Sequence, residues 1–402
     1  MSFKNFAPWL LVIFLFGAFL QQTWLVTFSV TLAVVFLLAQ VWKEHALKGV
    51  TYTRRWHYRR GFPGETTTVR IVAANNKFLP LSWLRAVDRW PDTVGPTLPP
   101  HASDRARRIA NHGQLINLFS FKWFEKITRP VEIQFRKRGV YPLGPVRLES
   151  GDIFGIAEGS KTLENREFLT VFPEILPFKS LKLPTEDPFG YQASRKRLFE
   201  DPNLPIGVRP YQPEDDFRRV HWGATARTGD LQVKIYQPVT SRLMMVCLNV
   251  LTSKRPWLGT NQDLLERLVS LAATIAYQGI EDNYAVGLIS NGCLTHADHP
   301  FHIPPGRSPG QLAILLEALA SVTAYTTAPF EDYILNALPA TAYGATLVIV
   351  TGFVTPELSQ TLLRLKRYRA NTTLISLEET PPPDLPGIRV VHLPFEKGAS
   401  NE

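Results

Sequence analysis

The side chains best suited to chemistry gather in one stretch of the chain, residues 207–228. These 22 residues contain three acids, four arginines, a histidine, a tryptophan and a tyrosine. Groups of this kind are unfavourable when buried without partners, so the stretch is expected to form a paired network or a binding surface. As catalysts, Asp215, Asp216 and His221 are the candidates, because neighbouring carboxylates can split their pKa values and histidine can shuttle protons.

The spacing of the same residues also permits a structural interpretation. A helix beginning at Pro213 would place Asp215 one turn before Arg218 and Arg219, so that acids in the first turn meet basic partners. Arg218 would also lie one turn before Trp222, within reach of a cation–π contact.

The end of this segment carries its own signals. Gly229 can adopt the left-handed conformation that closes a helix, and residues 231–236 alternate like an edge strand. Three interpretations of the whole segment are therefore open: a structural staple between two domains, a surface that recognises a partner, and a catalytic cluster.

The N-terminal region has the composition of a membrane hairpin. Residues 5–42 carry no charge, and as one helix these 38 residues would run about 57 Å, against ~30 Å for the hydrocarbon core. The polar residues 21–23 divide them into two spans, near 3–20 and 24–42. Because Lys4 precedes the first span and basic residues follow the second, both termini are expected in the cytoplasm. A signal peptide is the competing interpretation, but no small-x-small cleavage site is present.

A basic, β-rich region follows the hairpin. Between Lys43 and Ser150 there are 20 Lys and Arg against 8 Asp and Glu. Period-two alternation predicts strands at 66–73, 82–87, 131–135 and 146–149, with the basic side chains at outward positions. The pattern predicts a small antiparallel sandwich, immunoglobulin-like in type, over residues 43–175. Its basic side chains either contact anionic lipid or simply keep the outer face of the sheet in water. Nucleic acid is not expected, since no nucleic-acid-binding motif is present.

The C-terminal region alternates apolar strands with amphipathic helices. Strands are predicted at 243–250, 284–289, 346–350 and 373–377, and helices at 262–277, 312–322 and 356–368. Unbroken apolar strands indicate a parallel sheet covered on both faces, over residues 241–396, with residues 176–240 linking it to the sandwich. No glycine-rich phosphate loop follows a strand, so no nucleotide cofactor is expected.

Other chemical motifs are weak. Cys247 and Cys293 lie in apolar surroundings and form no metal or disulfide pattern. His296, His299 and His302 are spaced three apart, but the prolines among them predict an extended polar loop rather than a metal site.

A compound signature runs through the linking segment. It consists of Gly207, Arg209, Tyr211, Pro213, Asp215, Asp216, Arg218, Trp222, Ala226 and Arg227, followed by residues 231–234. Together with the hairpin, Gly64-Glu65, Asn75, residues 138–145 and residues 152–155, this pattern resembles the membrane-anchored prokaryotic family labelled domain of unknown function 58. The resemblance implies a neighbouring MoxR-type AAA+ ATPase as partner and a C-terminal domain similar to von Willebrand factor A domains, a Rossmann-type α/β fold.

The chain departs from that family in two places. Glu214 stands where the family has glycine, and Gly223 where it has a basic residue. The von Willebrand-type metal motif Asp-x-Ser-x-Ser is replaced by Asn249, Leu251 and Ser253. Because Leu251 offers no oxygen and Asn249 no charge, this adhesion-type site is degenerate and no metal is expected.

The sequence thus predicts a non-enzymatic membrane protein facing the cytoplasm, in four parts: a hairpin (1–42), a sandwich (43–175), the signature segment (176–240) and an α/β domain (241–396). Its expected role is that of an interaction or scaffold module that partners a MoxR-type ATPase. The alternatives are a hydrolase-type enzyme using Asp215, Asp216 and His221, and a structural subunit of an envelope assembly.

Overall fold

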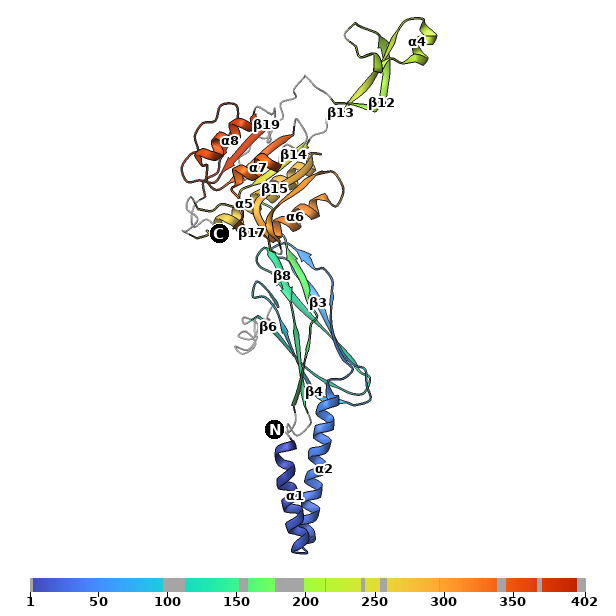
Figure 1. Ribbon diagram of the computed structural model, residues 1–402, viewed down its shortest axis with the longest axis vertical. Helices are drawn as coiled ribbons and strands as arrows, with labels where there is room; N and C mark the ends of the chain where they lie inside the picture. Colours follow the sequence, from blue (N-terminus) through green and yellow to red (C-terminus); the bar gives the residue numbers. More distant parts are fainter. Residues whose placement is uncertain are drawn as a thin grey trace. The chain divides into compact units, whose positions relative to one another are not determined.

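The computed structural model describes residues 3–96, 113–151, 158–177, 199–213, 215–239, 243–253, 259–295, 297–337, 345–366 and 371–395 (Figure 1). The predicted motif at 152–155 lies outside these ranges. The chain divides into two compact units, Met1–Pro173 and Glu174–Glu402.

Two apolar helices begin the chain and lie side by side (Figure 1). Helix α1 covers Phe3–Phe19 and α2 covers Thr23–Ala46, and Gln21 turns the chain between them with a positive φ of 55°. In the described part of the chain, α2 is the helix long and apolar enough to cross a bilayer. The 17 residues of α1 extend about 26 Å, somewhat short of the ~30 Å hydrocarbon core.

The β region of the first unit is built mainly from antiparallel strand pairs, with one parallel pair between β2 and β11. One sheet has the order β1-β3-β7-β5 and a second has the order β10-β9-β4-β6. Their strands are β1 Val50–Trp56, β3 Thr66–Asn75, β4 Leu81–Arg89, β5 Val94–Pro96, β6 Gln114–Phe121, β7 Lys126–Phe135, β9 Val146–Gly151 and β10 Glu158–Leu163. A small third sheet joins β2 Arg60–Gly61, β11 Glu167–Val171 and β8 Gly139–Leu143. The four strands predicted here from alternation are confirmed.

The two main sheets share one apolar core, which also receives the end of α2. Ile71 of the first sheet and Leu84 and Phe119 of the second belong to one buried cluster, together with Ala46 and Leu47. The second apolar helix is therefore packed onto the β domain at its C-terminal end. This packing fixes which loops of the domain lie near the helix.

One arginine of the β region departs from the predicted outward pattern. Arg54 is 5% exposed, and its guanidinium donates to both carboxylate oxygens of Asp88, at 2.8 and 2.5 Å. Tyr52 donates to the same carboxylate, and Glu167 accepts from Arg54 and from the Trp56 indole. A charge can be buried when it is paired and hydrogen-bonded in this way, which period-two alternation does not reveal.

The α/β part of the second unit has the strand order β16-β15-β14-β18-β19-β20, with β17 against β15. Strands β14 Leu243–Leu248, β15 Ala285–Leu294, β18 Thr346–Thr351, β19 Asn371–Ser376 and β20 Arg389–His392 are parallel. Strands β16 Ala297–Gly306 and β17 Val322–Thr326 run antiparallel to β15. The strands and helices predicted for this region are confirmed, and the structure adds the strands β16, β17 and β20 and a helix at Phe330–Ala337.

Helices cover both faces of this sheet. The helices are α5 Gln262–Glu281, α6 Gln311–Ser321, α7 Phe330–Ala337 and α8 Pro356–Lys366. Gly279 of α5 lies against Met244, whereas Met245 belongs to the cluster that contains α7 and α8 side chains. Because successive strand residues point to opposite faces, α5 and the pair α7 and α8 lie on opposite sides.

The histidine-containing loop was predicted wrongly. Residues 297–306 form β16, an edge strand that pairs with β15. In this pairing His302 lies opposite Ile289 of β15. Edge strands tolerate proline because one row of backbone groups needs no partner, so Pro300, Pro304 and Pro305 do not prevent pairing. The side chains of His299 and His302 are exposed, while His296 lies outside the described residues.

Candidate interaction surface on the signature segment

The signature segment is an antiparallel hairpin with a compact insertion. Strands β12 Phe199–Pro210 and β13 Gln232–Val239 pair in a register that sets Arg209 opposite Val233 and Gly207 opposite Ile235. Backbone hydrogen bonds close the insertion at both ends, from Tyr211 N to Leu231 O and from His221 N to Gln232 O. The predicted strand at 231–236 is thereby confirmed as part of β13.

Asp215 is paired with Arg209, where the sequence predicted Arg218 or Arg219 as the partner. The Arg209 guanidinium donates to both carboxylate oxygens of Asp215, at 2.6 and 2.5 Å. The backbone N–H of Gln212 donates to the same carboxylate at 2.9 Å. The hydrogen bonds from Arg209, and then that from Gln212, lower the pKa of Asp215. This bidentate pair holds the turn at residues 211–215 against the end of β12.

The long helix predicted from Pro213 does not form. A 3₁₀ turn, η2, covers Phe217–Arg219, and the helix α4 covers Trp222–Thr228. Between them Val220 is extended, is 3% exposed and bridges to Val233 of β13. Burying this valine against the hairpin interrupts the helix, so Asp215 and Arg218 do not face each other across a helical turn.

The other two members of the proposed catalytic cluster cap the two helical pieces. The Asp216 carboxylate accepts the N–H of Arg218 at 3.0 Å and caps η2. The Nδ1 atom of His221 accepts the N–H of Ala224 at 3.0 Å and caps α4, which puts the proton of the neutral ring on Nε2. Asp215, Asp216 and His221 are thus brought into one small insertion, with each side chain engaged in a different local contact.

Helix α4 ends as the sequence predicts. Gly229 adopts a left-handed conformation with φ of 79°, and its N–H donates to Thr225 O. The Thr225 hydroxyl in turn accepts the N–H of Gln232, which ties the helix to β13. Of the remaining signature residues, Pro213, Ala226 and Arg227 are exposed.

Three rings meet on this insertion in a cluster that we call the aromatic surface: the half-buried Tyr211 and the exposed Phe217 and Trp222. The Tyr211 and Phe217 ring centroids are 5.8 Å apart, and those of Phe217 and Trp222 are 6.1 Å apart. Phe217 is 56% exposed and Trp222 is 62% exposed. The ring next to Trp222 is therefore that of Phe217, where the sequence predicted the Arg218 guanidinium. Phe217 is the member of this surface that sequence reasoning missed, although an aromatic residue between Tyr211 and Trp222 was a visible signal.

The residues of the degenerate metal motif take part in a network of hydrogen bonds between uncharged groups at the carboxyl end of β14. Asn249 is 2% exposed; its amide donates to Thr351 Oγ1 at 3.2 Å, and its carbonyl oxygen accepts from Asn291 Nδ2 at 3.1 Å. The same oxygen accepts the N–H of Leu251 at 3.2 Å. Asn249 and Leu251 therefore close this end of the sheet with hydrogen bonds between uncharged groups. Among the described residues, no group of three or more His, Cys, Asp or Glu could hold a metal ion.

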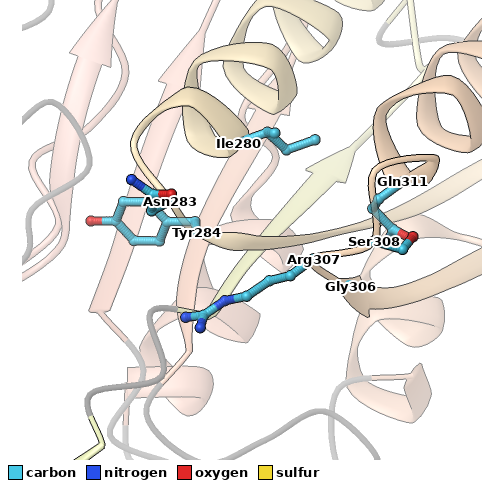
Figure 2. Close-up of a pocket in the computed structure, with 7 residues that line it drawn as sticks. All are labelled: Ile280, Asn283, Tyr284, Gly306, Arg307, Ser308 and Gln311. Atoms are coloured by element: carbon cyan, nitrogen blue, oxygen red, sulfur yellow. The ribbon is translucent and has the colours of Figure 1, made fainter.

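Cavities open among the described residues of the α/β part. One of about 320 Å³ lies between the end of α5 and the start of α6, with Tyr284, Arg307 and Gln311 in its wall (Figure 2). Another, about 270 Å³, lies at the carboxyl ends of β14, β18 and β19, beside the Asn261 cap of α5. Glu378 in its wall is 8% exposed and accepts the N–H of Val354. Neither cavity contains a residue of the family signature.

Comparison with known proteins places the signature in a family. Residues 207–397 match the family described as "Protein of unknown function DUF58". A relative from Bacillus subtilis (strain 168), "Uncharacterized protein YeaD", is 26% identical over 173 residues, 43% of this chain. The match spans 41% of the relative's own length, so well under half of that protein is represented.

Solved structures resemble the chain only distantly. Spo0M, a sporulation control protein from Bacillus subtilis, aligns over 31% of this chain and 50% of its own, at 11% identity and a TM-score of 0.17. A chain of the CaDoc0917–CaCohA2 complex aligns over 30% of this chain and 99% of its own, at 12% identity and a TM-score of 0.19. The similarity to the family described as "Protein of unknown function DUF58" therefore lies in residues 207–397, just under half of this chain.

Proposed function

We propose that this protein is a membrane-anchored interaction module, and that the aromatic surface of Tyr211, Phe217 and Trp222 is its contact with a protein partner. The observation that carries the proposal is the exposure of Phe217 and Trp222 on a small, hydrogen-bonded scaffold. Large aromatic side chains with few rotatable bonds are the residues that dominate binding energy at protein interfaces. A partner that covers these rings removes apolar surface from water at little cost in side-chain order.

The charged residues of the segment support this role through the scaffold they build. Arg209 and Asp215 brace the turn, while Asp216 and His221 cap the two helical pieces. Asp215, Asp216 and His221 each already accept a hydrogen bond from a guanidinium or backbone donor within the segment, a structural role that the catalytic interpretation does not require. We therefore favour binding over hydrolysis as the role of this cluster.

The proposal extends to the topology of the anchor. We propose that α1 and α2 both cross the membrane, with both termini in the cytoplasm, because basic residues follow α2 and Lys4 precedes the apolar part of α1. The β region then acts as an immunoglobulin-like spacer, and the α/β part as a domain of the von Willebrand A type with a degenerate metal site.

The proposed partner is a MoxR-type AAA+ ATPase, which would act with this protein in assembling or maturing envelope or other client complexes. This partner follows from the family resemblance of the signature residues. The uneven distribution of charge is compatible with it, because the basic residues concentrate before residue 150 and leave the signature segment free of a strong net charge.

A binding assay between the detergent-solubilised full chain and the neighbouring ATPase tests the proposal. Phe217→Ala and Trp222→Ala are each expected to weaken binding by about 2 kcal/mol, or roughly 30-fold, as for aromatic anchors at other interfaces. Tyr325→Ala is the matched control, since Tyr325 is as exposed as Trp222 (62%) but lies on β17.

The outcomes separate the competing roles. Equal affinity for the wild type and both aromatic variants would remove the aromatic surface from the interface. Loss of an in vitro hydrolytic activity in His221→Gln, with ATPase binding unchanged, would favour the enzymatic alternative instead.

A further inference from the structure

The membrane-proximal end of the β domain carries a second exposed aromatic cluster, which we call the aromatic platform: Phe78, Trp123 and Phe124. Phe78 is 73% exposed, Trp123 is 60% exposed and Phe124 is 67% exposed. The rings of Phe78 and Trp123 stack with centroids 5.5 Å apart and planes 7° apart. Three large rings exposed together on two adjacent loops indicate that another surface covers them.

The platform is tied directly to the end of α2. Lys77, which precedes Phe78, donates from Nζ to the carbonyl oxygens of His45 at 2.9 Å and of Lys48 at 2.7 Å, and also to that of Ala46. Ala46 is the last residue of α2, so the lysine caps the negative end of the helix dipole. The loop that holds Phe78 is therefore placed by the helix terminus.

The second loop is joined to the first by the backbone. The N–H of Phe124 donates to the carbonyl of Lys77 at 3.1 Å, and Asn75 donates from one amide group to the carbonyls of both Leu79 and Lys122 at 2.9 Å. Trp123 and Phe124 are therefore held at the same level as the end of α2.

If α2 crosses the membrane, its C-terminal end lies at the interface between the bilayer and water. Trp24 and Trp42 are 18 residues apart in α2, about 27 Å, close to the thickness of the hydrocarbon core. His45 and Ala46 lie three and four residues beyond Trp42, about 5–6 Å further out, whereas each headgroup layer is about 5–8 Å thick. The residues that Lys77 contacts are thus at headgroup depth.

The composition of the platform fits lipid rather than protein. Aromatic rings concentrate at headgroup level, where the ring body is apolar and the surroundings are polar. Exposed Lys48 and Lys122 flank the rings and would face anionic headgroups, which attract nearby basic residues by about 1 kcal/mol each. From this geometry we infer that the aromatic platform inserts into the leaflet at the C-terminal end of α2 and fixes the tilt of the β domain on the membrane.

The inference rests on the proposed membrane span of α2, and one experiment tests both separately. The full chain is reconstituted in nanodiscs that contain anionic phospholipid, and single cysteines carry an environment-sensitive fluorophore. Cys247 and Cys293 are buried, and the labelled wild type serves as the blank. Trp123→Cys reports the platform, and Val34→Cys in α2 reports the span.

Tyr58→Cys is the matched control for the platform. Tyr58 is 63% exposed, close to the value for Trp123, and belongs to the same domain. It lies two residues beyond the far end of β1, a seven-residue strand that extends about 20 Å from the end nearest α2. Nitroxide lipids labelled in the headgroup or deep in the acyl chain then report depth.

We expect the fluorophore at position 123 to emit at a shorter wavelength than the fluorophore at position 58. It is also expected to be quenched more by headgroup nitroxide than by acyl-chain nitroxide. Adding Phe78→Asp and Phe124→Asp should reduce this quenching, because charges resist insertion. The fluorophore at position 34 should be quenched most by the acyl-chain nitroxide.

Three results overturn the inference. If position 123 behaves like position 58 while position 34 is quenched in the acyl region, the anchor spans but the platform stays in water. A blue-shifted but unquenched fluorophore at position 123 would mean that protein, not lipid, covers the platform. If position 34 is not quenched either, the membrane span itself fails, and the inference fails with it.

Discussion

The Arg209 guanidinium forms a bidentate salt bridge with the Asp215 carboxylate, with N–O distances of 2.6 and 2.5 Å. The pair links the end of strand β12 to the loop that carries the aromatic surface. Two parallel charge-assisted hydrogen bonds fix the relative orientation of both groups more strictly than a single contact does. The pair therefore fixes the turn at residues 211–215 against the end of β12.

Removing either partner of the pair should loosen the insertion. We expect Arg209→Ala and Asp215→Ala each to speed hydrogen exchange over residues 211–221, and the double variant to be no worse than the more severe single variant. Arg218→Ala, which removes an exposed arginine of the same signature, should leave exchange in this region unchanged. Additive effects of the two substitutions would show that Arg209 and Asp215 act independently.

The pair should also make the insertion sensitive to acid. The Arg209 and Gln212 hydrogen bonds hold the pKa of Asp215 below its unfolded value, which is about 3.9. A carboxyl of this kind stabilises the folded insertion above the unfolded pKa, and the contribution is lost as pH falls through the lower, folded pKa. The difference in hydrogen exchange between wild type and Asp215→Asn should therefore be full near neutral pH and vanish in strong acid. A difference that persists unchanged in acid would contradict this mechanism.

Lys77 should stabilise the junction between α2 and the β domain. Lys77→Met keeps most of the side-chain length but removes the hydrogen bonds to three backbone carbonyls. We expect a loss of about 2 kcal/mol in the free energy of unfolding, the range measured for hydrogen bonds that involve a charged group. Lys122→Met is the control, because Lys122 is exposed, and it should change stability by less than about 0.5 kcal/mol. Equal effects in denaturant titrations would argue against the capping role.

A negative charge introduced into the neutral network at the end of β14 should lower the stability of the protein. Asn249→Asp removes the amide that donates to Thr351 and buries a carboxylate without a cation, so we expect a loss of about 3–5 kcal/mol near neutral pH. Burial raises the pKa of such a carboxyl, so the loss should shrink as pH falls and the group becomes protonated. Asn261→Asp is the control, because Asn261 caps the N-terminus of α5, where a carboxylate is equally favourable.

The same variant tests the degenerate metal site. Leu251 supplies no oxygen, so added Mg²⁺ should not restore the stability lost in Asn249→Asp. Restoration by Mg²⁺, measured as a shift in the unfolding midpoint, would show that a cation site survives at this end of the sheet.

The periodicity of the sequence was enough to predict most secondary structure. The alternation at 66–73 corresponds to β3, and the helical spacing at 262–277 corresponds to α5, because burial on one face imposes these periods locally. One departure is β16, which arises because its prolines are compatible with an edge strand, and edge position is a property of the whole sheet.

Within the signature, the sequence by itself determined the paired state of Asp215 and the left-handed end of α4 at Gly229, since both depend on residue type and short spacing. It could not determine the identity of the partner. The buried bridge between Val220 and Val233 breaks the helix that would have joined Asp215 to Arg218, and this bridge exists only once β12 and β13 are in register.

The tertiary structure alone decided two further features. The buried Arg54 is compatible with its strand because Asp88 and Glu167 reach it from other strands. The aromatic platform exists because antiparallel pairing of β3 with β7 brings Phe78 beside Trp123, 45 positions along the sequence. Local pattern encodes which face of an element is buried, whereas the meeting of distant loops depends on sheet register and on where a helix ends.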